Sequence, residues 1–170
     1  SILCNDNYRV EDHKCIVCLP GTYNSAGDDA SGPDTVCDTI QCSENEYVSN
    51  HTCQACPEGT YNESGDLASG SDTVCDSILC NDNYYVSDHE CIECAPGTYN
   101  SSGDDASGPD TVCDTIQCSE NEYVSNHTCQ ACPVGTYNAA GDLASEPDTV
   151  CDSILCNNNY YVSDHECVQC

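Results

Sequence analysis

The spacing of the cysteines constrains this chain more than any other feature of its sequence. From Cys4 onward the pattern C-x10-C-x2-C-x18-C-x4 recurs every 38 residues without insertion or deletion. Such a fixed period predicts tandem copies of one structural unit. We place the end of a preceding repeat at 1–3, full repeats at 4–41, 42–79, 80–117 and 118–155, and a partial fifth repeat at 156–170.

A second period of 76 residues is superimposed on the first. Repeats 4–41 and 80–117 differ at 6 of 38 positions, and repeats 42–79 and 118–155 differ at 5, whereas the neighbours 80–117 and 118–155 differ at 15. The chain therefore alternates between a type A and a type B repeat. This alternation indicates duplication of a two-repeat block, and whether it has a mechanical role stays open.

The composition favours a stapled fold over a large apolar core. The chain has 19 Cys among 170 residues and no Phe, Trp or Met, and units near 40 residues seldom fold without cross-links. Turn residues surround short runs at 84–87 and 97–100 that are typical of strands. We predict a small disulfide-rich fold, mostly irregular with short β-hairpins, arranged as an elongated solenoid-like rod of 38-residue repeats.

The charge excludes several classes of partner. The net charge is −28, with only 2 Lys and Arg residues. Nucleic-acid binding needs clustered cations and is therefore excluded. No apolar stretch approaches the roughly 20 residues of a membrane span, so we expect no membrane insertion in this segment.

The cysteines suit two chemistries. Disulfides within a repeat have three possible pairings of four cysteines, and the spacing does not choose between them. A Cys4 zinc site is the alternative, since Cys37, Cys42, Cys53 and Cys56 have ligand spacing. We favour disulfides because N-glycosylation sequons, typical of secreted chains, occur at four positions. The sequon residues are Asn50, Asn62, Asn100 and Asn126.

An aspartate and a histidine also recur once per repeat, and we expect neither to be catalytic. One aspartate per repeat lies in an oxygen-rich turn that a weakly bound Ca²⁺ could use, although we favour a turn-forming role. These aspartates are Asp28, Asp66, Asp104 and Asp142. One histidine recurs in every repeat (His13, His51, His89, His127 and His165). Because catalytic residues do not recur at even intervals, we expect these histidines to face solvent or to pack within the fold. We predict that the protein is not an enzyme and has no catalytic residue and no cofactor beyond weak Ca²⁺.

Tyrosine is the largest side chain available to this fold. We expect the tyrosines of the Gly-Thr-Tyr segments to pack against disulfides as the main apolar body of each repeat. They are Tyr23, Tyr61, Tyr99 and Tyr137. Tyr84 and Tyr160 occur in type A repeats, where type B repeats carry Glu46 or Glu122. We predict that these two tyrosines make contacts between repeats or between chains.

The third repeat resembles a known cysteine-rich module over nearly its whole length. Its motif is Cys80-(x3)-Tyr84-Tyr85-(x5)-Cys91-(x2)-Cys94-(x2)-Gly97-Thr98-Tyr99-(x8)-Gly108-Pro109-Asp110-Thr111-(x1)-Cys113. This is similar to repeats of the tumour-necrosis-factor-receptor type and to ephrin-receptor-like and furin-like modules. It is also similar to tandem repeats of protist surface proteins, including ciliate immobilisation antigens.

The resemblance implies a disulfide pairing. Receptor repeats of that family have six cysteines, and the two that are missing here are bonded to each other in the family. The implied pairs are Cys4–Cys15, Cys18–Cys37, Cys42–Cys53, Cys56–Cys75, Cys80–Cys91, Cys94–Cys113, Cys118–Cys129, Cys132–Cys151 and Cys156–Cys167. Cys170 would then pair outside the given chain, as expected for an excerpt of a longer array, or form a bond between chains.

We therefore expect a structural, extracellular or cell-surface protein that follows the secretory pathway. It would be a glycosylated component of a coat, hair or filament and would self-associate into fibres or arrays. The alternative is a binding module, namely the ectodomain stalk of a surface receptor, adhesin or surface antigen. Because related folds host many functions, the resemblance does not choose between the two.

Overall fold

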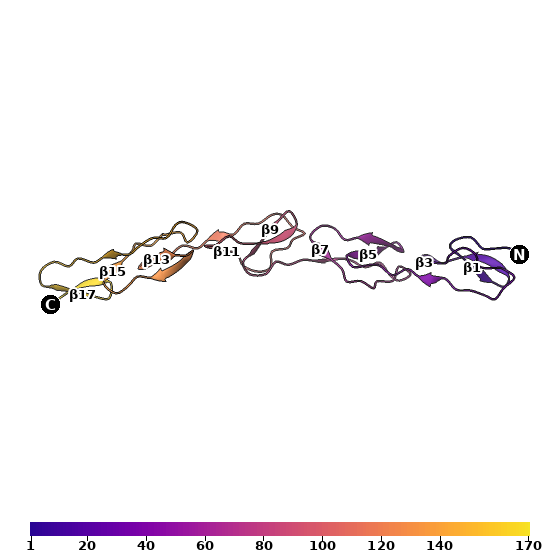
Figure 1. The fold of residues 1–170 in the computed structure, drawn as a ribbon, viewed down its shortest axis with the longest axis horizontal. Coiled ribbons are helices and arrows are strands. Elements are labelled where there is room, and N and C mark those ends of the chain that lie inside the picture. Colours follow the sequence, from indigo (N-terminus) through magenta and orange to yellow (C-terminus); the bar gives the residue numbers. More distant parts are fainter. The chain divides into compact units, whose positions relative to one another are not determined.

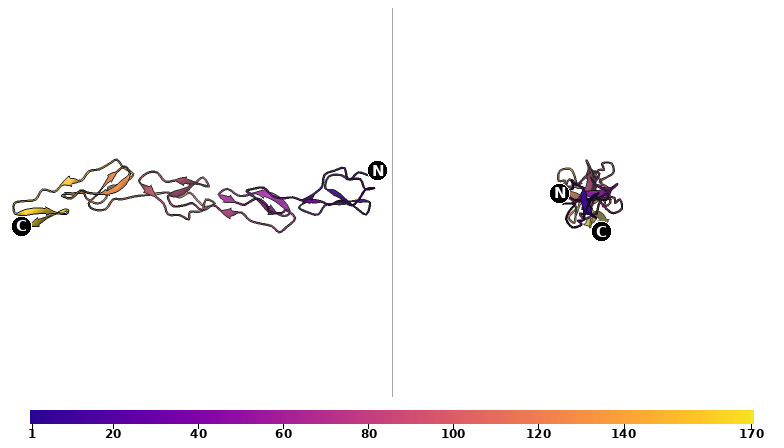
Figure 2. Two further views of the ribbon diagram at one scale, coloured as in Figure 1. Left: turned by 60° about the horizontal axis from the view of Figure 1, so that its bottom comes forward. Right: turned by 90° about the vertical axis from the view of Figure 1, so that its right-hand side faces the viewer.

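The computed structural model describes all 170 residues and contains short strands and no helix (Figure 1). The chain divides into two compact units, Ser1–Ile78 and Leu79–Cys170, each described here by itself. Both units consist of two-stranded antiparallel sheets joined by loops, as the further views in Figure 2 also show. The predicted all-strand, disulfide-rich fold of repeated hairpins is confirmed.

A hairpin with four-residue strands recurs every 38 residues. The five hairpins are β1 (Tyr8–Glu11) with β2 (Lys14–Val17), β5 (Glu46–Ser49) with β6 (Thr52–Ala55), β9 (Tyr84–Ser87) with β10 (Glu90–Glu93), β13 (Glu122–Ser125) with β14 (Thr128–Ala131), and β17 (Tyr160–Ser163) with β18 (Glu166–Gln169). In the first four, both turn residues have positive φ; Asn50 has 48° and His51 has 60°. Two consecutive positive φ values suit the tightest hairpin turns, which match the twist of the strands.

A second, shorter strand pair follows the hairpin in the first four repeats. The pairs are β3 (Thr22–Tyr23) with β4 (Asp38–Thr39), β7 (Thr60–Tyr61) with β8 (Asp76–Ser77), β11 (Thr98–Tyr99) with β12 (Asp114–Thr115), and β15 (Thr136–Tyr137) with β16 (Asp152–Ser153). The loop between the two strands returns to the hairpin. In the first repeat the Thr35 amide donates to the Val10 carbonyl at 2.9 Å, and the Val10 amide donates to Thr35 Oγ1 at 2.8 Å.

The core of each full repeat is small and lies between the hairpin and this loop. One hairpin valine per repeat is fully buried (Val10, Val48, Val86 and Val124, each 0% exposed). A loop alanine of each full repeat is also buried, at Ala30, Ala68, Ala106 and Ala144. The expectation that tyrosine forms the main apolar body is wrong. Tyr23, Tyr61, Tyr99 and Tyr137 are 44–47% exposed, because a two-stranded layer has no second layer to cover a large ring.

Nine disulfides staple these repeats. They are Cys4–Cys15, Cys18–Cys37, Cys42–Cys53, Cys56–Cys75, Cys80–Cys91, Cys94–Cys113, Cys118–Cys129, Cys132–Cys151 and Cys156–Cys167, which are the pairs that the resemblance implied. Cys170 has a free, exposed thiol. The four cysteines of the alternative zinc site all belong to disulfides. Closing loops of 11 or 19 residues stabilises the fold by about 3 kcal/mol each.

Candidate functional site: the joint between repeats

Two consecutive repeats meet through backbone atoms at a glycine. Gly21, with φ of 74°, approaches the next repeat so closely that a Cβ would lie 2.2 Å from the carbonyl carbon of Ala68 and 2.4 Å from the Ser69 nitrogen. Real Cβ atoms do not come this close to backbone, so the contact requires glycine. We call this contact the joint.

Hydrogen bonds connect both sides of the joint. The Ile40 amide donates to the Gly21 carbonyl at 3.0 Å, and the Ala68 amide donates to the Ile40 carbonyl at 2.9 Å. His51 Nδ1 lies 3.0 Å from the Ala68 carbonyl oxygen. Because that oxygen can only accept, Nδ1 carries the proton.

The second compact unit contains the same joint. A Cβ on Gly97 would lie 2.3 Å from the carbonyl carbon of Ala144. Ile116 donates its amide to the Gly97 carbonyl at 3.0 Å, Ala144 donates to Ile116 at 2.8 Å, and His127 Nδ1 lies 3.0 Å from the Ala144 oxygen. Both joints place a type A glycine against a type B alanine, so the geometry recurs with the period of 76 residues.

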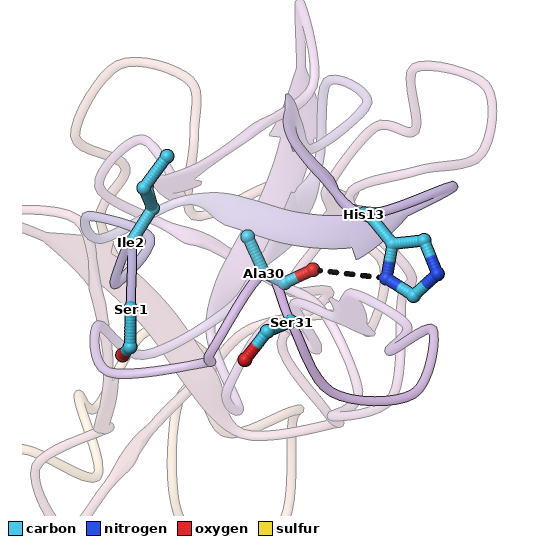
Figure 3. A pocket seen from close by; sticks show the side chains of 5 residues that line it. All are labelled: Ser1, Ile2, His13, Ala30 and Ser31. Atoms are coloured by element: carbon cyan, nitrogen blue, oxygen red, sulfur yellow. Dashed lines mark hydrogen bonds between the residues drawn. The ribbon is translucent and has the colours of Figure 1, made fainter.

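The first repeat carries the same receiving residues. A cavity of about 420 Å³ is lined by Ser1, Ile2, His13, Ala30 and Ser31. Ile2, His13, Ala30 and Ser31 occupy the repeat positions of Ile40, His51, Ala68 and Ser69. Figure 3 shows Ala30 and Ser31 between Ile2 and His13, with His13 Nδ1 directed at the Ala30 carbonyl 3.2 Å away.

The histidines therefore have a structural position. In the first four repeats Nδ1 faces the carbonyl of the buried alanine, at 2.9–3.2 Å. His165 instead faces the Thr136 carbonyl at 2.6 Å. Sequence reasoning predicted packing or solvent exposure for these residues and missed their place at the joint. The close contact of Gly21 was also missed. The recurrence of this glycine in the Gly-Thr-Tyr segment of every full repeat could have indicated that the position requires glycine.

The recurrent aspartates organise the loop of each repeat. Asp66 Oδ2 accepts hydrogen bonds from Thr73 Oγ1 at 2.6 Å and from Asn62 Nδ2 at 2.8 Å. These bonds, that from Thr73 first, lower the pKa of Asp66 because they stabilise its charged form. Asp28, Asp104 and Asp142 have equivalent bonds from Thr and Asn and likewise a lowered pKa.

This network accounts for the aspartates as turn-forming residues. No three side chains among His, Cys, Asp and Glu converge as a metal site would require. A second set of aspartates closes the hairpin turns, since Asp72 Oδ1 accepts from the Asn50 amide at 2.9 Å and Asp148 Oδ1 from the Asn126 amide at 2.8 Å. The structure provides these carboxylates with protein donors.

The remaining predicted residues lie on the surface of the hairpins. Tyr84 begins β9 and is half-buried, and Tyr160 begins β17 and is 45% exposed. Tyr8 stands at the same repeat position and is also exposed. Their contacts between repeats or chains stay a prediction.

No helix of the structure is long and apolar enough to span a membrane.

Neither the sequence nor the fold matches a family model, a curated protein or a solved structure.

Proposed function

We propose that this protein is a structural, extracellular repeat protein whose units stack into a solenoid-like rod and form part of a cell-surface coat, hair or filament. The observation that carries the proposal is the recurrence of one joint with one geometry, at Gly21 on Ala68 and at Gly97 on Ala144. A unit that joins its neighbour identically each time can be extended in one dimension. That property serves a fibre or a spacer.

The cross-links support an extracellular location. Nine disulfides are typical of proteins that fold in an oxidising compartment. A surface this acidic repels other copies at low salt and stays soluble. An extracellular coat in a salt-containing medium suits both properties.

Self-association would use contacts between different surfaces of neighbouring units. At Gly21 on Ala68 and at Gly97 on Ala144, the Gly-Thr-Tyr loop of one repeat meets the alanine loop of the next. Because the two surfaces differ, contacts of this kind are head-to-tail and can continue from unit to unit.

Electron microscopy of native material, together with non-reducing peptide mapping, tests the function. We expect regular filaments or arrays and the nine disulfides described above. Discrete monomers would contradict the filament, and free thiols throughout would contradict the extracellular location. A membrane-anchored monomer would favour the receptor or antigen stalk instead.

A further inference from the structure

The four N-glycosylation sequons fall into two structural classes. Asn50 and Asn126 lie in hairpin turns. Asn62 and Asn100 lie in loops, directly after β7 and β11 respectively. We propose that the folded protein carries N-linked glycans at Asn50 and Asn126 only, and that the other two sequons are structural. This inference deepens the proposed function, because it assumes passage through a secretory pathway.

Both side-chain N–H groups of each loop asparagine donate hydrogen bonds within the fold. Asn62 Nδ2 donates to the Glu46 carbonyl at 2.8 Å and to Asp66 Oδ2 at 2.8 Å. Asn100 Nδ2 donates to the Tyr84 carbonyl and to Asp104 Oδ2, at 2.9 and 2.7 Å. A primary amide has two N–H donors, and here both are used. The loop is tied to the hairpin through them.

Glycosylation removes one of these donors. The C1–O bond of a polyprenyl-diphosphate-linked oligosaccharide breaks, an Nδ2–C1 bond forms, Nδ2 loses one proton, and the diphosphate leaves. The remaining N–H can serve only one of the two acceptors, and the sugar takes the place of the other. A sugar added before folding has the same effect, since that repeat then cannot complete its network.

Repeats without a sequon show why this asparagine is present. Asn24 and Asn138 occupy the same repeat position and make the same bonds, from Asn24 Nδ2 to Tyr8 O and Asp28 Oδ2 and from Asn138 Nδ2 to Glu122 O and Asp142 Oδ2. Alanine stands two residues later in both repeats, so neither is a sequon. The asparagine therefore serves the fold in all four full repeats.

The hairpin asparagines have the opposite character. Both are exposed, and neither side-chain amide donates or accepts a hydrogen bond; only their backbone amides are bonded. Type A repeats carry aspartate at this turn position, at Asp12, Asp88 and Asp164. The turn thus forms without an amide, and the fold does not require Nδ2.

The third residue of the sequon also distinguishes type B hairpins from type A hairpins. Thr52 and Thr128 complete the sequon in the type B hairpins, and the aligned residues of type A hairpins are Lys14, Glu90 and Glu166. Asn and Thr therefore occur together or not at all at this turn. Asn126 and Thr128 also border an open groove of about 670 Å³, which leaves room for a sugar.

The test is site mapping of the full 170-residue chain secreted from eukaryotic cells behind a cleavable signal. Amidase release in ¹⁸O-water marks each glycosylated Asn as labelled Asp. In the fraction with all nine disulfides, we expect label at Asn50 and Asn126 and none at Asn62 or Asn100. Label at either loop site, or absence from both hairpin sites, would overturn the proposal.

Matched variants separate the two classes. Thr52→Glu with Thr128→Glu introduces the type A residue and should remove all N-glycan mass from the chain. Ser64→Ala with Ser102→Ala destroys the loop sequons, and neither serine hydroxyl is bonded to the loop network, so the glycan mass should not change. A loss of mass in the second pair would contradict the assignment.

The melting temperature of unglycosylated, oxidatively refolded protein tests the roles of the two asparagine classes without requiring secretion. Asn50→Asp should leave the melting temperature unchanged, whereas Asn62→Asp should lower it, because it removes two donors beside Asp66. Free thiols in protein from the natural source would refute the extracellular proposal and leave this comparison intact.

Discussion

Replacing Gly97 by alanine adds one carbon atom at the joint in the second compact unit. That atom would lie 2.3 Å from the carbonyl carbon and oxygen of Ala144. Favourable carbon contacts are about 3.5–4.0 Å long, so the two backbones must separate by more than about 1 Å. Overpacking of this kind costs about 1–3 kcal/mol. The φ of 80° adds about 1–3 kcal/mol of strain for a residue with a Cβ.

Gly103→Ala is the matched control. Gly103 has φ of 109°, yet no atom lies within 4 Å of the added carbon. It suffers backbone strain of about 1–3 kcal/mol without the steric contact. The difference between the two variants, about 1–3 kcal/mol, measures the joint.

Amide hydrogen exchange is the appropriate assay, because disulfides keep each repeat folded while the joint opens locally. The Ile116 and Ala144 amides report on the joint through their bonds of 3.0 and 2.8 Å. Their exchange in Gly97→Ala should be about 5- to 150-fold faster than in Gly103→Ala. Equal exchange in the two variants would refute the joint as a tight glycine contact.

Three further outcomes follow from the core, the loop network and the cross-links. Val86→Ala should destabilise its repeat by about 2 kcal/mol in thermal or denaturant unfolding, since Val86 is 0% exposed. Val112→Ala, at a site 77% exposed, should change stability by less than about 0.5 kcal/mol. Because the pKa of Asp104 is lowered by Thr111 and Asn100, its contribution is present at neutral pH and lost as pH falls below about 4. Melting from pH 7 to 3 should show this loss, and Asp104→Asn should reduce it; an unchanged profile would argue against the network. Replacing Cys94 and Cys113 together by alanine should cost about 3 kcal/mol, and a variant as stable as the parent would count against that bond.

The local structure could be predicted from the sequence because it depends on neighbouring residues. The strand at Tyr84–Ser87 and the short strand at Thr98–Tyr99 lie within the expected runs. The turn at Asp88-His89, with φ of 52° and 62°, also depends on a distant residue, since the Asp88 amide donates to Asp110 Oδ1 at 2.9 Å. The two strands follow from strand preferences alone.

The core and the joint could not be predicted because they depend on which residues meet in space. Tyr99 is large and was expected inside, but it is 45% exposed, whereas Val86 and Ala106 are fully buried. Gly97 meets Ala144 in the following repeat, a pairing that no local pattern reveals. The choice between turn and Ca²⁺ roles for Asp104 required knowing that Thr111 and Asn100 face it.

The joint has a consequence for how such a gene can change its length. Both joints place a type A glycine against a type B alanine, and the contact is to backbone atoms. No pair of complementary side chains has to be inherited together. An in-frame unequal crossover that adds or deletes one 76-residue pair of repeats keeps this alternation and therefore creates junctions like those already present. Alleles that differ by whole pairs of repeats should all encode chains that fold.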